Sequence, residues 1–285
     1  MDTNWPWKFV SEVCQTINFR GTVLIGGSQI SAEASDFSDW DCYFIALTTQ
    51  ELLRVIRQKT VIIRLRTEFQ LPVSCILLTN YLFNHSWYYV AGQDKNGCLV
   101  ENGVDKSLLA NQALKASYRE WLLASLTTDE KRSYHLGKAM LQGLSSLMLS
   151  LIPKEELPRP LFRVKLLSEK ILSRLALSNQ EIVACQRLLQ YKLTPMQEIS
   201  SDDEALVSQV IENAYLHFLQ RSFSFRSYVL YNLWALKHNS PRYLFVNPDK
   251  MVVYNLRQLA LCPPNERRKE TVEYFMKQVW PVVII

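Results

Sequence analysis

The chain has 285 residues, of which 48% are hydrophobic, enough for a core of ordinary size. This composition excludes a disordered chain. Its 32 Lys and Arg residues exceed its 27 Asp and Glu residues by a net charge of +5. So small an excess suits an anionic ligand, and it argues against a nucleic-acid partner without excluding one, because binding many phosphates needs a dense basic surface.

The cysteines and the apolar runs indicate the compartment. The six cysteines lie far apart, with no C-x-x-C pair, at Cys14, Cys42, Cys75, Cys98, Cys185 and Cys262. Such spacing predicts free thiols in a reducing compartment and neither a disulfide framework nor a zinc site. The first residues lack the basic start of a secretory signal, and no apolar run approaches the ~20 residues that span a bilayer. We therefore expect a soluble cytoplasmic protein with no membrane partner.

Residues 1–105 are rich in short apolar runs bounded by turn signals. Strands are predicted at 22–27, 40–47, 59–66, 71–79 and 97–103. Between the second and third, residues 48–58 have a helical pattern that Thr48 or Thr49 could cap. Long apolar strands interrupted by helical segments predict an α/β or α+β domain whose sheet is covered on at least one face.

From residue 106 to 285 the apolar residues recur at helical spacing. Helices are predicted at 107–126, 130–152, 161–177, 179–192, 202–222, 222–238 and 267–279. Ser201 and Asp202 are the capping candidates for the fifth of these. Proline-containing breaks separate the segments, so the second part is expected to be an all-α domain of about five to seven helices.

Two aspartates at the mouth of an apolar strand are the most unusual feature. Asp39 and Asp41 are two residues apart, so on a strand both side chains lie on one face, roughly 7 Å apart. Burying two like charges is costly unless a positive group lies between them. Magnesium commonly takes one or two carboxylates and fills its other positions with water and phosphate oxygens. The pair therefore predicts a magnesium site.

A Gly26-Gly27-Ser28 turn stands ten residues before this pair. Two residues without Cβ let the backbone bend sharply and approach a ligand closely. Backbone N–H groups and the Ser28 hydroxyl can donate hydrogen bonds to phosphate oxygens. The turn and the carboxylates together are predicted to hold a metal-bound nucleoside triphosphate.

The pattern Gly-Gly-Ser, ten residues, Asp-x-Asp on an apolar strand resembles the signature of the DNA polymerase beta-like nucleotidyltransferase superfamily. That superfamily includes the aminoglycoside and lincosamide nucleotidyltransferases, whose members confer antibiotic resistance, and the minimal nucleotidyltransferases of toxin–antitoxin systems. The resemblance implies a nucleotidyltransferase domain with a mixed sheet over residues 1–105. It implies a helical substrate-binding domain over 106–285 by analogy of architecture alone.

The resemblance also implies roles for the residues of the motif. Ser28 and the backbone at Gly26 and Gly27 would hold the phosphates, and Asp39 and Asp41 would bind Mg²⁺. A nucleoside monophosphate, with ATP the expected donor, would pass to a hydroxyl of an acceptor while pyrophosphate leaves. The acceptor is expected to be a small molecule such as an antibiotic, bound between the two domains.

The sequence departs from the family pattern at the third acid. Members of the superfamily carry a further carboxylate on a later strand, and the equivalent position in the strand 71–79 is Ser74. We favour Glu68 as a displaced catalytic carboxylate, with Asp94 and Glu101 as the other candidates nearby in the sequence. The acceptor could instead bring its own base, or the domain could have lost catalysis and bind nucleotide as a regulatory module. Transfer to a protein or to a tRNA end is a further alternative.

Basic residues lie between the strands of the predicted domain. Arg64 and Arg66 would share one face of a strand at 59–66, and a guanidinium there could bind triphosphate oxygens in a bidentate manner. A solvent-facing strand edge is the more common cause of such alternation.

Overall fold

The computed structural model describes residues 5–29, 33–70, 72–84, 89–103, 105–175, 177–196, 198–220, 248–261 and 283–284. The chain divides into two compact units, and the first division falls after Asp105. The first unit comprises Met1–Asp105, Pro158–Leu161 and Pro281–Ile285, and the second comprises Lys106–Leu157 and Phe162–Trp280. Two short stretches from later in the chain therefore belong to the first unit, which the sequence did not indicate.

The first unit is built on a mixed sheet with the strand order β5-β4-β1-β2-β3-β6. Its strands are β1 (Thr22–Gly26), β2 (Trp40–Ala46), β3 (Val73–Thr79), β4 (Ala91–Gln93), β5 (Leu99–Glu101) and β6 (Val283–Ile284). Only β2 and β3 pair in parallel, and every other neighbouring pair of this sheet is antiparallel. Four of the predicted strands are confirmed as β1, β2, β3 and β5, whereas β4 and β6 were not predicted.

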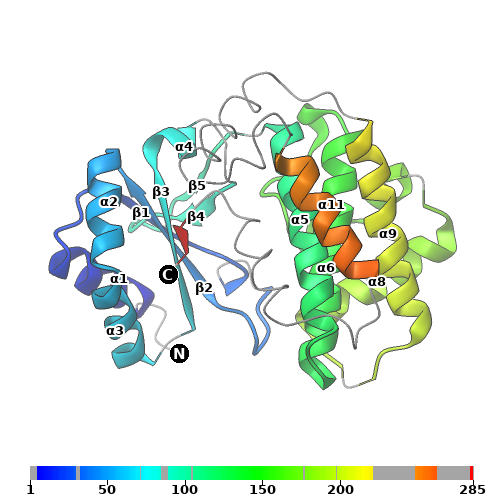
Figure 1. The fold of residues 1–285 in the computed structure, drawn as a ribbon, viewed down its shortest axis with the longest axis horizontal. Helices are drawn as coiled ribbons and strands as arrows, with labels where there is room; N and C mark the ends of the chain where they lie inside the picture. The colour runs from blue at the N-terminus through cyan, green and yellow to red at the C-terminus, as the bar shows by residue number, and fades with distance from the viewer. Residues whose placement is uncertain are drawn as a thin grey trace. The chain divides into compact units, whose positions relative to one another are not determined.

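Three helices of the first unit lie on one side of this sheet (Figure 1). They are α1 (Trp5–Thr16), α2 (Thr49–Arg57) and α3 (Lys59–Phe69), and a short α4 (Asn80–Asn84) follows β3. The predicted helix at 48–58 is confirmed, and its N-cap is Thr48, whose Oγ1 accepts a hydrogen bond from the Glu51 backbone N–H at 3.1 Å. Helix α1 was not predicted, although Phe9 and Val13 recur in it at helical spacing and are fully buried.

The strand predicted at 59–66 is wrong, because these residues begin helix α3. The β-branched run suggested a strand, but Ile62 and Leu65 lie on one helical face and pack into the core, while Ile63 between them is exposed. Packing of that face decides the structure over local β-propensity. Arg64 and Arg66 consequently do not share a strand face, and the triphosphate role considered for them loses its geometric basis.

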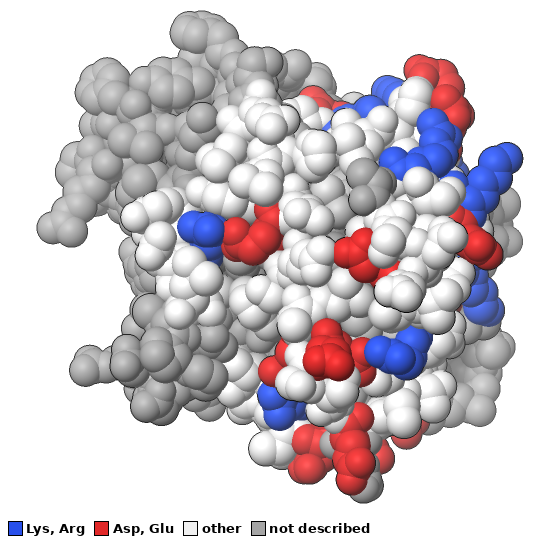
Figure 2. Space-filling model, turned by 90° about the vertical axis from the view of Figure 1, so that its right-hand side faces the viewer, with Lys and Arg blue, Asp and Glu red and all other residues white. Residues whose placement is uncertain are grey.

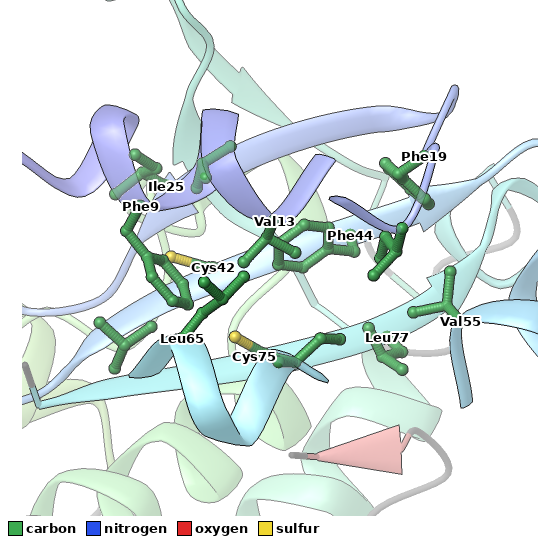
Figure 3. Close-up of a cluster of buried hydrophobic side chains, with 14 of the residues drawn as sticks. Phe9, Val13, Phe19, Ile25, Cys42, Phe44, Val55, Leu65, Cys75 and Leu77 are labelled. Atoms are coloured by element: carbon green, nitrogen blue, oxygen red, sulfur yellow. The ribbon is translucent and has the colours of Figure 1, made fainter. Parts of the chain in front are cut away.

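The core between the sheet and these helices fixes which strand residues face which way. Figure 3 shows Cys42, Phe44, Cys75 and Leu77 of the sheet among side chains such as Phe9 and Leu65 of the helices. Because side chains alternate along a strand, the residues between these core members face the opposite side of the sheet. In β2 and β3 the opposite side therefore carries the side chains of Asp41, Tyr43, Ile45, Ser74, Ile76 and Leu78.

The segment Pro158–Leu161 is bound to the β4–β5 side of the first unit. Arg159 Nη1 donates a hydrogen bond to Glu101 Oε1 at 2.7 Å, and the Tyr89 hydroxyl donates to the same oxygen at 2.7 Å. The Tyr89 hydroxyl also accepts a hydrogen bond from the Leu161 backbone N–H at 2.6 Å. Burial and the neighbouring Glu101 carboxylate raise the pKa of Tyr89 well above its ordinary value, so this phenol stays protonated and can donate.

The described part of the second unit is helical. Its helices are α5 (Lys106–Ala124), α6 (Asp129–Leu151), α7 (Glu169–Leu172), α8 (Asn179–Leu193), α9 (Ser201–Leu219) and α11 (Pro248–Leu261), with single 3₁₀ turns η2 (Lys154–Glu156), η3 (Val164–Leu166) and η4 (Ser173–Leu175). Four of the predicted helices are confirmed as α5, α6, α8 and α9. The chain is thus α+β, with a mixed sheet in the N-terminal part and mostly helices after it.

Three features of the helical prediction are not confirmed by the structure. The single helix predicted at 161–177 is wrong, because two 3₁₀ turns and the short α7 occupy that stretch. The N-cap of α9 is Ser200, whose side chain accepts from the Asp203 N–H, rather than Ser201 or Asp202. The helices predicted at 222–238 and 267–279 lie outside the described residues.

A buried ion-pair cluster joins α5 to α6. Glu120 is 2% exposed, and its Oε2 lies 2.8 Å from His135 Nδ1. Its Oε1 lies 3.4 Å from Arg119 Nη1 and 3.8 Å from Lys138 Nζ. Burial alone would raise the pKa of Glu120, but Lys138, Arg119 and the hydrogen bond with His135 outweigh it and hold this pKa well below its ordinary value.

Among the helices described, none is both long and apolar enough to span a membrane.

Candidate functional site

The Gly-Gly turn begins at Gly26, the last residue of β1, and lies against β2. Gly26 pairs with Asp41 across the antiparallel ladder, and a Cβ at Gly26 would lie 2.5 Å from the Tyr43 ring. Gly27 has φ +86°, and a Cβ there would lie 2.8 Å from Asp41 Oδ2. Each of the two positions therefore requires a glycine for a different steric reason. The absence of a side chain at Gly27 is what lets the Asp41 carboxylate lie directly against the turn.

Ser74 of the neighbouring strand is related to each aspartate in a different way. Asp41 is aligned with Ser74 in the parallel β2–β3 pair, and the Ser74 hydroxyl donates a hydrogen bond to Asp39 Oδ2. Because the side chains of Asp41 and Ser74 face the side of the sheet away from α1, α2 and α3, the Asp39 carboxylate that Ser74 binds lies on that side too. Both aspartates are partly exposed. The structure thus brings together Gly27, Asp39 and Asp41, three of the residues that the sequence predicted for the site.

The loop between the turn and the aspartates is cross-linked by side chains that the sequence interpretation missed. The Gln29 Nε2 donates to the Ser38 carbonyl at 3.0 Å, immediately before Asp39. The Ser35 N–H donates to Ser38 Oγ at 2.9 Å, and the Ser38 N–H donates to the Ser35 carbonyl at 2.9 Å. The spacing of the two serines in a Ser-Asp-Phe-Ser stretch is typical of side-chain-bonded turns and could have indicated this. These bonds hold the backbone that leads into Asp39.

The half-buried Ser28 lies at the start of this loop. Its carbonyl accepts a hydrogen bond from the Glu33 N–H at 3.2 Å, so the backbone of Glu33 lies against Ser28. Glu33 is 2% exposed, an unusual burial for an acid. The described part of the loop is therefore compact, with Ser28 next to the glycine that contacts Asp41.

Glu68, the favoured third carboxylate, is not brought to the aspartates. It lies on α3, on the opposite side of the sheet, with its side chain 56% exposed and its Oε1 3.5 Å from Arg64 Nε one helical turn earlier. The prediction required the strand at 71–79 to begin earlier and to include Glu68, whereas residues 59–69 form a helix that packs on the core. Glu68 is therefore withdrawn as a residue of this site.

The two other candidate acids also lie elsewhere. Asp94 lies in the β4–β5 turn, where its Oδ1 accepts hydrogen bonds from the Asn96 and Cys98 N–H groups, each at 2.9 Å. Glu101 lies on β5, which β4 and β1 separate from β2, and it is engaged by Tyr89 and Arg159. Within the described residues, no three His, Cys, Asp or Glu side chains come together as a metal site.

The site lies above an apolar core that contains protonated thiols. Burial raises the pKa of Cys42 well above its ordinary value, and the neighbouring Cys75, Asp41 and Asp39 raise it further. Burial likewise raises the pKa of Cys75 to about 12. These thiols are neutral at physiological pH, so they act as packing groups and not as nucleophiles. The five cysteines in the described part of the chain are free, as the sequence predicted.

The donor set fits one hard divalent cation. Asp41 and Asp39 supply carboxylate oxygens, which Mg²⁺ prefers, and the remaining positions would be filled by water and phosphate oxygens. The Gly27 contact shows that a side chain at this position of the turn would collide with the Asp41 carboxylate. The arrangement can therefore hold a cation beside a turn that approaches an anionic ligand closely. Comparisons of the chain with protein-family models, with curated proteins and with solved structures found no match.

Proposed function

We propose that the chain is a magnesium-dependent nucleotidyltransferase that moves a nucleoside monophosphate, with ATP the donor, to a hydroxyl of a small molecule. The observation that carries this proposal is the contact between the Gly27 turn and the Asp41 carboxylate, with Asp39 held beside it by Ser74. Phosphate groups need close backbone approach, and their cation needs carboxylates at the same place. The site offers both within one continuous stretch of sequence.

Each residue has a role that follows from its position. Asp39 and Asp41 would hold Mg²⁺, which when bound neutralises charge on the phosphates. Gly26 and Gly27 would let the backbone approach the triphosphate, and Ser28 would donate its hydroxyl to a phosphate oxygen. The bonds of Gln29 and Ser38 fix the loop before any ligand arrives, so little ordering remains to be done on binding.

The acceptor is proposed to be a small molecule because the charge distribution gives little support to a nucleic acid. On the face drawn in Figure 2, the Lys and Arg side chains of the described residues are interspersed with Asp and Glu and do not form a continuous basic patch. An acceptor that carries many phosphates would need such a patch. A protein acceptor makes no such demand and remains the alternative within the same chemistry.

Incubation with ATP labelled at the α-phosphate, with Mg²⁺ and a panel of aminoglycosides, lincosamides, proteins and tRNA, tests the proposal. We expect a labelled small molecule and released pyrophosphate, and we expect Asp39→Asn and Asp41→Asn to abolish both. Asp36→Asn is the matched control, since Asp36 is an exposed acid of the same loop. Equal activity in all three variants would refute the assignment of the aspartate pair.

A second candidate function is a nucleotide-binding module without transfer activity. The observation that favours it is Ser74, a neutral hydroxyl aligned with Asp41 at the position where the resemblance implies an acid. A serine is a poor general base at neutral pH, so the acceptor would have to be activated in another way. Magnesium-dependent ATP binding without pyrophosphate release, across the whole panel, would favour this function over transfer.

A further inference from the structure

Helices α2 and α3 form a basic surface that the proposed function does not use. They lie on the side of the sheet away from the aspartates and follow one another in the chain with one residue, Gln58, between them (Figure 1). Residues 48–70, which contain both helices, hold five Lys and Arg residues and two Glu residues. This segment therefore has a charge of +3, against +5 for the whole chain, so more than half of the excess positive charge comes from it.

The two acids of this segment do not neutralise its outer surface. The Glu51 side chain is 10% exposed and accepts hydrogen bonds from two backbone N–H groups at 2.7 Å and 2.9 Å. Glu68 lies 3.5 Å from Arg64, but both side chains are more than half exposed, so water screens the pair. Arg57 and Lys59 are exposed, and neither has an acidic partner within the described residues. Positive charge is thus left uncompensated where the two helices meet.

Two exposed aliphatic side chains lie beside these bases. Leu53 is 44% exposed and Ile63 is 41% exposed. Leu53 precedes Arg57 by four residues in α2, and Ile63 follows Lys59 by four residues in α3. Residues four apart are neighbours on a helix surface, so each aliphatic group stands next to an uncompensated base. Apolar groups with charged groups around them are typical of the surfaces through which proteins bind one another.

We propose that the surface formed by Leu53, Arg57, Lys59 and Ile63, here named the α2–α3 surface, binds a partner protein that carries acidic side chains around a small apolar patch. Charge complementarity would select this partner and orient it. The two helices have 9 and 11 residues, about 30 Å of helix at 1.5 Å per residue, which is long enough to carry an interface. Because the aspartates lie on the other side of the sheet, the inference does not depend on the proposed function.

The exposed side chains favour a protein over a nucleic acid or a membrane. None of the exposed residues of α2 and α3 is aromatic, so the surface offers no ring on which a base could stack. Its few bases would also neutralise few phosphates. A helix that lies on a membrane needs a continuous apolar face, whereas the outer face of α3 also exposes Thr60 and Thr67. Leu53 and Ile63 are more than half covered, so they suit contact with another side chain better than insertion among lipids.

A defined acidic peptide tests the proposal. The probe is a fluorescently labelled synthetic helix of about 20 residues, with leucines along one face and glutamates on both sides of them. Fluorescence anisotropy should show saturable binding to the full chain. Binding should weaken as ionic strength rises from about 0.1 M to about 1 M, because the screening length falls from about 10 Å to about 3 Å. A second peptide, with the same leucines and with lysines in place of the glutamates, should not bind.

Two double variants locate the binding on the α2–α3 surface. Arg57→Glu combined with Lys59→Glu should weaken binding of the acidic peptide at least about tenfold, because like charges then face each other. Leu53→Ser combined with Ile63→Ser should weaken it about fivefold or more, because less apolar area is buried. Thermal unfolding checks that each variant folds. The charge variant changes only exposed side chains, so it decides the question even if the serine variant does not fold.

Lys95→Glu combined with Lys170→Glu is the matched control. It changes the net charge by the same amount at two exposed lysines outside α2 and α3, and it should leave peptide binding unchanged. An equal loss in this control would show an effect of net charge alone and overturn the proposal. Failure of the acidic peptide to bind the unaltered chain, or full binding to the Arg57→Glu, Lys59→Glu variant, would overturn it as well. Tighter binding to vesicles that contain phosphatidylserine, or to duplex DNA, lost in the same variant, would overturn the assignment to a protein partner.

Discussion

Gly27→Ala places a methyl group against the Asp41 carboxylate. At φ +86° an alanine costs about 1–2 kcal/mol in backbone strain alone. Its Cβ would also lie 2.8 Å from Asp41 Oδ2, so the carboxylate must move away from the turn. A displacement of about 1 Å in a catalytic site can cost roughly 10²-fold in rate. We therefore expect a moderate loss of stability together with a large loss of magnesium-dependent nucleotide binding and transfer.

Gly97→Ala is the matched control for the backbone part of this effect. Gly97 has φ +78°, and a Cβ there would meet nothing within 4 Å. Urea unfolding should show a loss of about 1–2 kcal/mol in both variants, with the larger loss in Gly27→Ala. Calorimetric titration with the nucleotide and Mg²⁺ should show weakened binding in Gly27→Ala alone. Unchanged nucleotide affinity in Gly27→Ala would refute the argument that this contact builds the site.

Three further predictions concern stability. Ser200→Ala should lower the free energy of unfolding by about 1 kcal/mol, because it removes the N-cap of α9. The neighbouring Ser201→Ala should have almost no effect. Equal losses of stability in urea unfolding would contradict the cap assignment. The pKa of Glu120 is lowered in the folded state, so its stabilising contribution is present above the ordinary Glu pKa of about 4.3 and is lost as pH falls below that value. The difference in unfolding free energy between Glu120→Gln and the unaltered protein should therefore become smaller in acid. A difference that does not change with pH would refute this. Tyr89→Phe should lower the melting temperature, because it leaves the Leu161 N–H without its acceptor and removes a hydrogen bond to Glu101; an unchanged melting temperature would show that these bonds contribute nothing.

The sequence predicts β1, β2 and β3 because each is an apolar run with turn signals at both ends. It fails at α3, where local β-branched residues suggest a strand and only contacts with the rest of the core reveal the helical face of Ile62 and Leu65. It also misses α11, although Val253, Leu256 and Ala260 recur there at helical spacing and are buried. In both places the helical period is present, but β-branched residues in α3 and prolines next to α11 favour other structures locally.

At the candidate site, too, features set by neighbouring residues could be predicted from the sequence, and features set by contacts with distant residues could not. Gly27, Asp39 and Asp41 lie within one short stretch, so their proximity could be predicted from the sequence. Ser74 is the position where the resemblance implies a third acid, and the structure aligns it with Asp41. The replacement acid could not be predicted in this way, because the position of Glu68 depends on how a whole segment folds and packs.

The pairing of β6 with β3 has a consequence for synthesis of the chain. Leu77 and Ile76 are made early, but their partners Val283 and Ile284 leave the ribosome only after the whole helical unit has been translated. During that interval the outer edge of β3 has no strand beside it and could pair with another nascent chain. A growing polypeptide of this protein therefore needs protection of this strand edge until Val283 and Ile284 appear, even if the helices have already formed.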